Sequence, residues 1–195
     1  MSLLIRSVIP NIEHSVFRWL KDVTYSRVSA GPEKTLEGWF TQPKALKIVS
    51  DYPDDISKIT APTLAIMVSD QRSQSGFRFQ SNEPAAQLFG PDRYSIQEDM
   101  LSLMIYGFVV GCGNDGASRR YRDNLMNDVY HLMKYVAGDV GITLYASSAT
   151  VLGSFDVQSI EARRIPSNAY EIEADRYRFV VDAQIVYSNE PEEIE

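Results

Sequence analysis

The chain has 195 residues, of which 44% are hydrophobic and 23% charged, a composition typical of a folded globular protein and not of a disordered or fibrous one. Nineteen basic residues against 26 acidic ones give a formal net charge of -7, which argues against tight binding to nucleic-acid phosphates. The single cysteine, Cys112, excludes an internal disulfide, and the sequence has no run of about 18 apolar residues to span a bilayer. We therefore expect a soluble intracellular protein.

The N-terminal part predicts one helix followed by an irregular segment. Four apolar residues recur at helical spacing and form one stripe: Ile12, Val16, Leu20 and Val23. Pro10 is expected near the first turn of this helix, where its missing N–H costs nothing. Glycines and prolines punctuate residues 25–43, which predicts an extended arm that carries two exposed aromatic residues, Trp39 and Phe40.

Two short strands are expected next, at residues 45–49 and 63–69, joined by an acidic turn. Residues 70–92 are polar and contain few periodic apolar positions. A loop of this length in a compact domain is usually functional or mobile.

The middle of the chain predicts a long strand and a long helix. A strand is expected over residues 93–111, and its apolar residues run almost continuously from Leu101 to Val110, which indicates burial on both faces at the centre of a sheet. Residues 117–136 have apolar residues at spacings of three and four, the pattern of an amphipathic helix, and Gly138 is expected to cap its C-terminus.

Three more strands are expected, at residues 141–146, 155–165 and 176–187, followed by an acidic tail at 190–195. In the strand at 155–165 the apolar residues change from odd-numbered to even-numbered positions near Gln158, which predicts a β-bulge. Because only one helix lies between strands, we expect a single α+β domain over residues 1–189, with an antiparallel or mixed sheet, a long helix packed on one face and an N-terminal helix.

The glycine-rich segment from Gly111 to Gly116 matches the G-x-G-x-x-G pattern of dinucleotide-binding turns. The following strand lacks the acidic residue that would bind a ribose. Two interpretations remain: a nucleotide-binding enzyme, or a sharp strand-to-helix turn in which Asn114 or Asp115 caps the helix.

Other catalytic and metal-binding patterns are missing from the sequence. Cys112 lies near a helix N-terminus, but the two histidines, His14 and His131, are poorly spaced to act as its base, and a small buried thiol is the alternative. The chain has too few histidines and cysteines for a typical structural zinc site. We therefore expect no enzyme activity, no cofactor and no metal.

Two arginine clusters are the candidate interface residues. Arg119, Arg120 and Arg122 lie in the first turns of the long helix, where cations are disfavoured by the helix dipole. They either form a solvated face or bind the carboxylates of a partner. Arg163 and Arg164 lie near the end of a strand, where they either protect a sheet edge or bind a partner in the same way.

The succession of elements resembles the tail terminator family of tailed bacteriophages, also called tail completion or neck proteins. Three parts carry this resemblance: the opening helix with the segment Ala61-Pro62-Thr63-Leu64-Ala65-Ile66, the central strand through Leu103-Met104-Ile105-Tyr106-Gly107 with a helix that contains Arg122-Asp123-Asn124-Leu125, and the closing strands with Ile165-Pro166 and Tyr177-Arg178-Phe179-Val180-Val181. The arm at 25–43 and the loop at 70–92 depart from the family pattern.

The resemblance implies a structural virion protein that is assembled in the host cytoplasm. Such proteins form a ring, usually a hexamer, that caps the tail tube and joins it to the head connector, with a sheath protein as a further candidate partner. An acidic ring would let DNA pass without tight binding. We expect the subunit interfaces to involve Trp39, Phe40 and the two arginine clusters. Another neck or baseplate adaptor that binds its partner through residues 70–92 is a further alternative.

Overall fold

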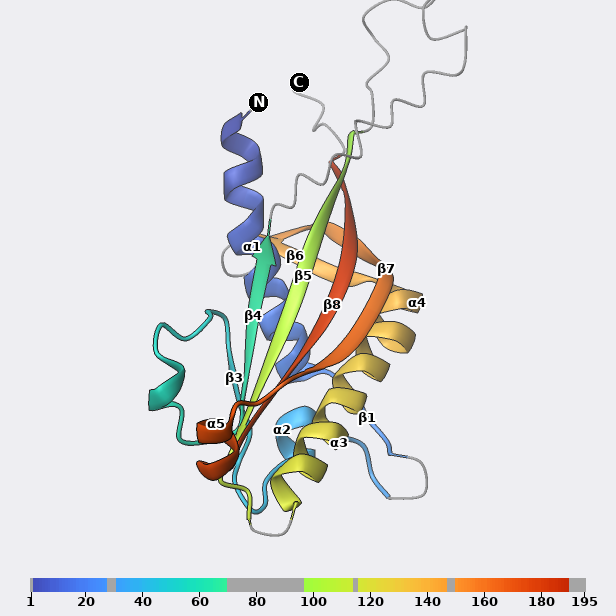
Figure 1. Ribbon diagram of the computed structural model, residues 1–195. Coiled ribbons are helices and arrows are strands. Elements are labelled where there is room, and N and C mark those ends of the chain that lie inside the picture. Colours follow the sequence, from blue (N-terminus) through green and yellow to red (C-terminus); the bar gives the residue numbers. More distant parts are fainter. Residues whose placement is uncertain (1, 28–30, 70–96, 114–115, 147–149, 190–195) are drawn as a thin grey trace, which may run out of the picture.

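The computed structural model describes residues 2–27, 31–69, 97–113, 116–146 and 150–189. A six-stranded sheet, in the order β3-β4-β5-β8-β7-β6, forms the framework, and a two-stranded ribbon pairs β1 with β2 (Figure 1). The strands are β1 (Thr24–Tyr25), β2 (Lys34–Thr35), β3 (Lys47–Val49), β4 (Thr63–Ser69), β5 (Gln97–Val110), β6 (Ile142–Ala146), β7 (Thr150–Ile165) and β8 (Arg176–Asn189). The helices are α1 (Ser2–Asp22), α2 (Leu36–Trp39), the 3-10 helix η1 (Ile56–Lys58), α3 (Ala117–His131), the π-helical segment η3 (Leu132–Ala137), α4 (Gly138–Val140) and α5 (Ala169–Glu173).

The sheet is mixed, because β3 runs parallel to β4 while all other neighbouring strands of this sheet are antiparallel. The predicted combination of helices with an antiparallel or mixed sheet is therefore confirmed at this level. The strand predicted at residues 63–69 has those bounds in the structure. The predicted bulge is also confirmed, since the register between β7 and β8 shifts between Val157 and Ser159.

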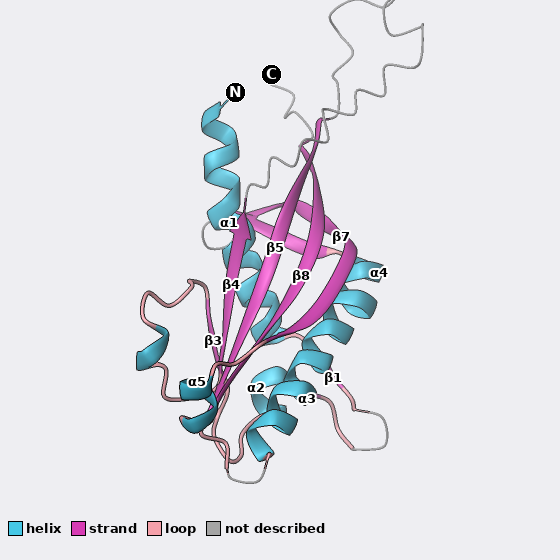
Figure 2. Ribbon diagram, in the orientation of Figure 1, coloured by secondary structure: helices cyan, strands magenta, loops and turns pink. Residues whose placement is uncertain are grey.

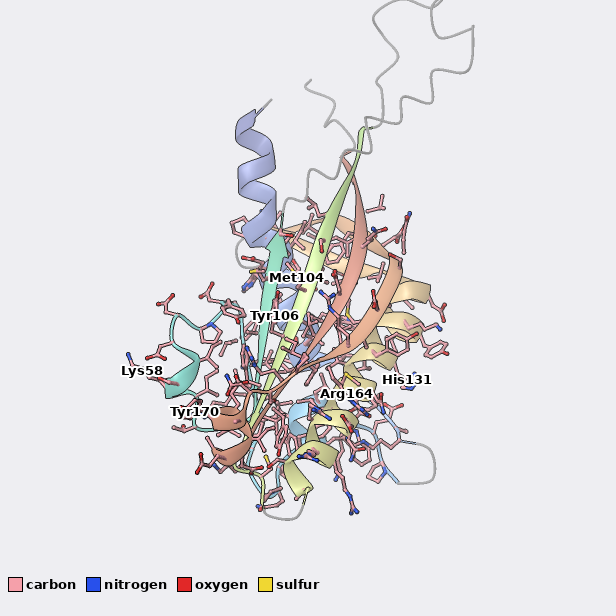
Figure 3. The ribbon with its side chains drawn as sticks, in the orientation of Figure 1. Lys58, Met104, Tyr106, His131, Arg164 and Tyr170 are labelled. Atoms are coloured by element: carbon pink, nitrogen blue, oxygen red, sulfur yellow. The ribbon has the colours of Figure 1, made fainter. Side chains whose placement is uncertain are left out.

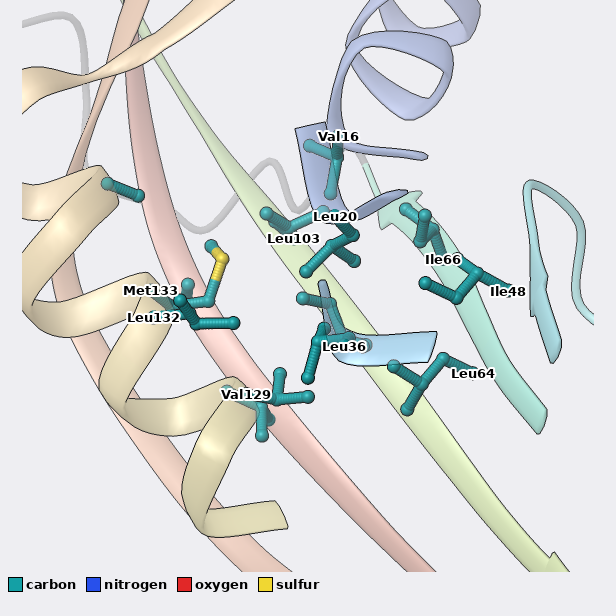
Figure 4. Close-up of a cluster of buried hydrophobic side chains, with 14 of the residues drawn as sticks. Val16, Leu20, Leu36, Ile48, Leu64, Ile66, Leu103, Val129, Leu132 and Met133 are labelled. Atoms are coloured by element: carbon teal, nitrogen blue, oxygen red, sulfur yellow. The ribbon is translucent and has the colours of Figure 1, made fainter. Parts of the chain in front are cut away.

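One face of the sheet is covered by α1, α2 and α3, and the main hydrophobic core lies between these helices and the strands (Figure 2). The predicted stripes are confirmed: Ile12, Val16 and Leu20 are fully buried. In the close-up of Figure 4, Val16 and Leu20 point toward Leu103 of β5. A second, smaller apolar cluster lies on the other face, between Phe108 of β5 and Ile59 of the segment that contains η1.

Polar side chains of α1 satisfy backbone groups at both edges of the sheet. Only the first three residues of β4 pair with the edge strand β3, so Val68 of β4 lies at the edge of the sheet. The N–H of Val68 donates to Glu13 Oε1 at 2.9 Å. The N–H of Tyr145 in the edge strand β6 donates to Ser15 Oγ at 2.9 Å. Unpaired edge groups invite pairing with other chains, so α1 protects two positions at which the sheet would otherwise be open.

The start of α1 differs from the prediction. The helix begins at Ser2, so Pro10 lies inside it and not in its first turn. Proline cannot donate the helical hydrogen bond, and the carbonyl of Arg6 loses that partner. Two helical turns precede Pro10, so this proline does not mark the start of the helix.

The predicted arm at residues 25–43 is also corrected. This segment contains β2 and α2, and it is fixed to α3 because Tyr25 Oη donates to Asp128 Oδ2 at 2.6 Å. Phe40 is only 4% exposed and belongs to the core, while Trp39 is partly buried and donates its Nε1–H to the carbonyl of Tyr25. The prediction that both aromatic residues are exposed is therefore wrong.

The glycine that caps the long helix is Gly141, three residues beyond the expected Gly138. A π-helical segment follows α3, and the helix continues through Gly138 to Val140. Gly141 ends it with a positive φ of 72°, and its N–H donates to the carbonyl of Ala137. A positive φ is a conformation that glycine adopts readily.

Other predictions lie outside the described residues. These are the loop at 70–92, the acidic tail at 190–195, the strand start at 93–96 and the helix caps Asn114 and Asp115. In the described part of the chain, no helix combines the length and apolar character needed to cross a membrane.

Candidate interaction site

Three of the predicted arginines come together where α3 packs against β7 and β8. Arg119 and Arg122 both lie against the ring of Tyr177, with their guanidinium carbons 5.4 Å and 5.5 Å from its centroid. Arg122 and Arg164 share the carboxylate of Asp123, with nitrogen–oxygen distances of 2.8 Å and 3.1 Å. We call these five residues the arginine network.

The arginine network is held rigidly at its centre and exposed at its ends. Tyr177 is 7% exposed and the side chain of Arg122 only 11%, so both are fixed by packing. The side chain of Arg164 is 62% exposed, and Arg119 is also exposed. Arg119 Nε–H donates to Tyr177 Oη at 3.3 Å, which orients its guanidinium.

The arginine network has an excess of positive charge. It holds three guanidinium groups against the single carboxylate of Asp123, which pairs with Arg122 and Arg164. Guanidinium groups that are already oriented bind carboxylates through paired hydrogen bonds at a small cost in side-chain entropy. The network is therefore suited to bind an acidic group on another molecule.

The remaining predicted interface residues lie elsewhere. Arg120 is exposed on α3 beside the network. Arg163 lies on the opposite face of the sheet from Arg164, because neighbouring residues of a strand point to opposite faces. Phe40 is buried in the core of its own chain, and Trp39 packs against the guanidinium of Arg27 and the ammonium of Lys34, each 5.0 Å from its ring centroid.

A second group of exposed side chains, which the sequence analysis missed, continues along the same helix. His131 stacks on Tyr135 at a ring distance of 5.6 Å, and Lys134 lies 5.3 Å from the Tyr135 centroid and 5.5 Å from that of Tyr130. The hydrogen bond to Tyr130 Oη raises the pKa of Lys134, which therefore stays charged. Spacings of four residues link these side chains, and that spacing is the signal visible in the sequence. We call them the aromatic cluster.

The glycine-rich turn has the geometry of a strand-to-helix connection. Gly111, Gly113 and Gly116 all have positive φ angles. The N–H of Cys112 donates to Ser118 Oγ, and Ser118 Oγ donates to Asp175 Oδ2. A phosphate at this turn would therefore meet an N–H that already has a partner, and a nearby carboxylate, which favours the turning role over nucleotide binding.

Cys112 has the properties of a core residue. It is 2% exposed, and burial raises the pKa of its thiol to about 11, which keeps it protonated at neutral pH. Within the described ranges, no group of three or more potential metal ligands lies together. A recess between η1, β5 and β8 has a volume of about 10 Å³, room for about one water molecule.

The contact of Tyr177 with the arginines could not be identified from the sequence, because Tyr177 lies 58 residues from Arg119 along the chain. The short helix α5 was also missed, although Asn168 and Glu171 form a capping box that has a recognisable spacing.

No protein-family model matches the chain, and a comparison with curated proteins finds no significant match. The candidate site therefore rests on its geometry and charge.

Proposed function

We propose that this protein is a structural subunit that assembles with copies of itself into a ring, as the tail terminator and neck proteins of tailed bacteriophages do. In this proposal it caps the tail tube, contacts the head connector on its other side and lets DNA pass through the ring. The sixfold symmetry and the place in the virion come from the resemblance of the sequence to that family.

The arginine network is the observation that carries this proposal. It is a preorganised cationic surface on a chain whose net charge is -7, and Arg119 and Arg164 extend from it into solvent. Surfaces rich in arginine and tyrosine are typical of protein interfaces. The aromatic cluster extends this surface along the same helix.

A ring also requires protection against open-ended pairing of sheet edges. Glu13 and Ser15 of α1 satisfy backbone N–H groups at the edges of β4 and β6. Copies of the chain are then less able to pair through their sheet edges, a contact that would lead to fibres. Association through side chains on the faces of the molecule is favoured instead.

Native mass spectrometry and negative-stain electron microscopy of the purified chain test the proposal. We expect a closed oligomer, with six subunits as the expected number, either in solution or on isolated phage tail tubes. A chain that remains monomeric at its highest soluble concentration and does not bind tail tubes would overturn it. Binding of a nucleotide, seen as a rise in melting temperature with NAD or ATP, would support an enzyme instead.

A further inference from the structure

We infer that the uncovered part of the opposite sheet face binds the arginine network and aromatic cluster of a second copy. This inference rests on the proposed function and identifies the two surfaces that meet. We call the uncovered part the open sheet face; its residues come from β4, β5, β8 and β7: Met67, Met104, Asp182, Gln184, Glu161 and Arg163, with Tyr106 at the border where Tyr52 packs.

The open sheet face lies on the side of the sheet away from α1 and α3. Met104 and Tyr106 lie on the side that faces the viewer in Figure 3, while His131 lies on the helix side. The segment that contains η1 packs over one end of this face, where its Ile59 lies against Phe108 and Tyr52 packs against Tyr106 with ring centroids 5.0 Å apart. Beyond Tyr106, no described element of the chain packs over it, and Glu161 and Gln184 are exposed.

One row of the open sheet face places two carboxylates side by side. Across four neighbouring strands the register aligns Met67, Met104, Asp182 and Glu161. Residues directly opposite each other in a sheet have side chains about 5 Å apart, and like charges in such a pair destabilise the sheet. The hydroxyl of Ser102 donates to Asp182 at 2.9 Å, but no described cation forms a salt bridge with Asp182 or Glu161.

This unbalanced pair is complementary to the arginine network of another copy. Arg119 and Arg164 are exposed guanidinium groups of a network with one carboxylate, whereas among the described residues Asp182 bonds only to the hydroxyl of Ser102 and no side chain pairs with Glu161. A guanidinium between two carboxylates would remove their repulsion and form charge-assisted hydrogen bonds. Arg163 lies on the next row, where Val180 separates it from Tyr106, and its one positive charge leaves the two carboxylates in excess.

The apolar parts of the two surfaces also match. Met67 and Met104 are partly exposed beside the carboxylates, and the aromatic cluster lies beyond the arginines on α3. Thioether sulfurs make favourable contacts with aromatic rings, and exposed tyrosines are frequent in interfaces. Because the two surfaces differ and lie on opposite faces of the sheet, the contact is head-to-tail, which is the type that closes into rings.

Charge reversal on each surface tests this assignment. The first variant is Arg119→Glu with Arg164→Glu, and the second is Glu161→Lys with Asp182→Lys. Each variant alone is expected to lose assembly, with at least a tenfold rise in the concentration needed for oligomers, because each brings like charges together. Mixed in equal amounts, the two variants should assemble again, since each then offers the surface that the other lacks. Native mass spectrometry reports all three samples.

Matched controls change the net charge equally at other places: Lys47→Glu with Lys58→Glu for the first variant, and Asp54→Lys with Asp139→Lys for the second. Both controls are expected to assemble like the parent chain. Circular dichroism checks that each variant folds, and Glu161→Lys alone replaces the second variant if Asp182→Lys prevents folding.

The outcomes separate the two proposals. If the parent chain assembles neither in solution nor on isolated tail tubes, the proposed function fails. If the parent chain assembles and the folded charge-reversal variants do so equally well, or if mixing restores nothing, the assigned surfaces are wrong while the ring remains.

Discussion

At the scale of single residues, Glu13 combines a structural contact with an electrostatic cost. Its carboxylate accepts the N–H of Val68, a residue that is 7% exposed. Burial raises the pKa of Glu13 above its usual value of 4.5; the hydrogen bond from Val68 lowers it in part, and the nearby Asp51 raises it further. The folded chain therefore binds the Glu13 proton more tightly than the unfolded chain does.

The hydrogen bond of Glu13 to Val68 stabilises the fold, whereas the buried charge of Glu13 destabilises it, so two substitutions of Glu13 are expected to give different results. Glu13→Ala removes the acceptor of a buried N–H and should lower the free energy of unfolding by about 1 to 3 kcal/mol. Glu13→Gln keeps an acceptor oxygen but cannot ionise. Because the unfolded chain releases the Glu13 proton at a lower pH than the folded chain, the parent loses stability as the pH rises from the usual value of 4.5 to the raised pKa, and the glutamine variant should gain stability relative to the parent over that interval.

Urea denaturation of both variants at several pH values measures these differences. Asp139→Asn, on the exposed helix α4, is the control for the loss of one negative charge. A parent chain that gains stability over Glu13→Gln as the pH rises would contradict the raised pKa of Glu13.

At the scale of elements, the strands could be predicted because their signal is local. Alternating apolar residues fix the bounds of β4, and a change of parity locates the bulge of β7. The parallel pairing of β3 could not be predicted, because a three-residue strand carries no signal for its direction. The burial of Phe40 depends on tertiary contacts with Tyr121, whose ring centroid lies 4.9 Å away.

The candidate site was also predicted only in part, because its contacts depend on the tertiary fold. The sequence identified Arg119 and Arg122 because clustered cations at a helix start are unusual, and Arg164 because it is one of two adjacent arginines near the end of a strand. Their convergence depends on which strands follow α3 in space, and only the fold brings Tyr177 beneath them. The separation of Arg163 from Arg164 was available from the sequence, since the period of a strand is two.

The pairing of β5 with β8 contains a close approach that predicts a coupled pair of residues. A Cβ atom added at Gly107 would lie 1.9 Å from Cε1 of Phe179, which is fully buried on the neighbouring strand. Gly107→Ala forces this ring to move and should cost about 1 to 3 kcal/mol of stability. Phe179→Leu leaves space in the core and is also expected to destabilise the chain.

The two changes should be less than additive. In the double variant the smaller leucine gives space to the new methyl group, so the loss of stability should be smaller than the sum of the single losses. Thermal or urea unfolding of the parent chain, both single variants and the double variant measures this coupling. Additive losses would show that Phe179 does not occupy the space above Gly107.

At the scale of the whole molecule, the two faces of the sheet differ in charge. The face covered by α3 carries the arginine network, and the open sheet face carries Asp182 and Glu161 in neighbouring positions. A contact between these faces in successive copies would be largely electrostatic at its edge and apolar around Met104 and Tyr106. These two contributions respond to salt in opposite directions.

Salt therefore identifies which contribution dominates the assembly. Between about 0.1 M and about 1 M salt the Debye length falls from about 10 Å to about 3 Å, so contacts between exposed charges weaken strongly. We expect the oligomer to dissociate over this range in sodium chloride, as measured by analytical ultracentrifugation at constant protein concentration. The Lys47→Glu and Lys58→Glu control should dissociate at the same salt concentration as the parent chain. An oligomer that becomes more stable with added salt would instead be held by its apolar residues, and Met104→Ala would then weaken it more than any charge reversal.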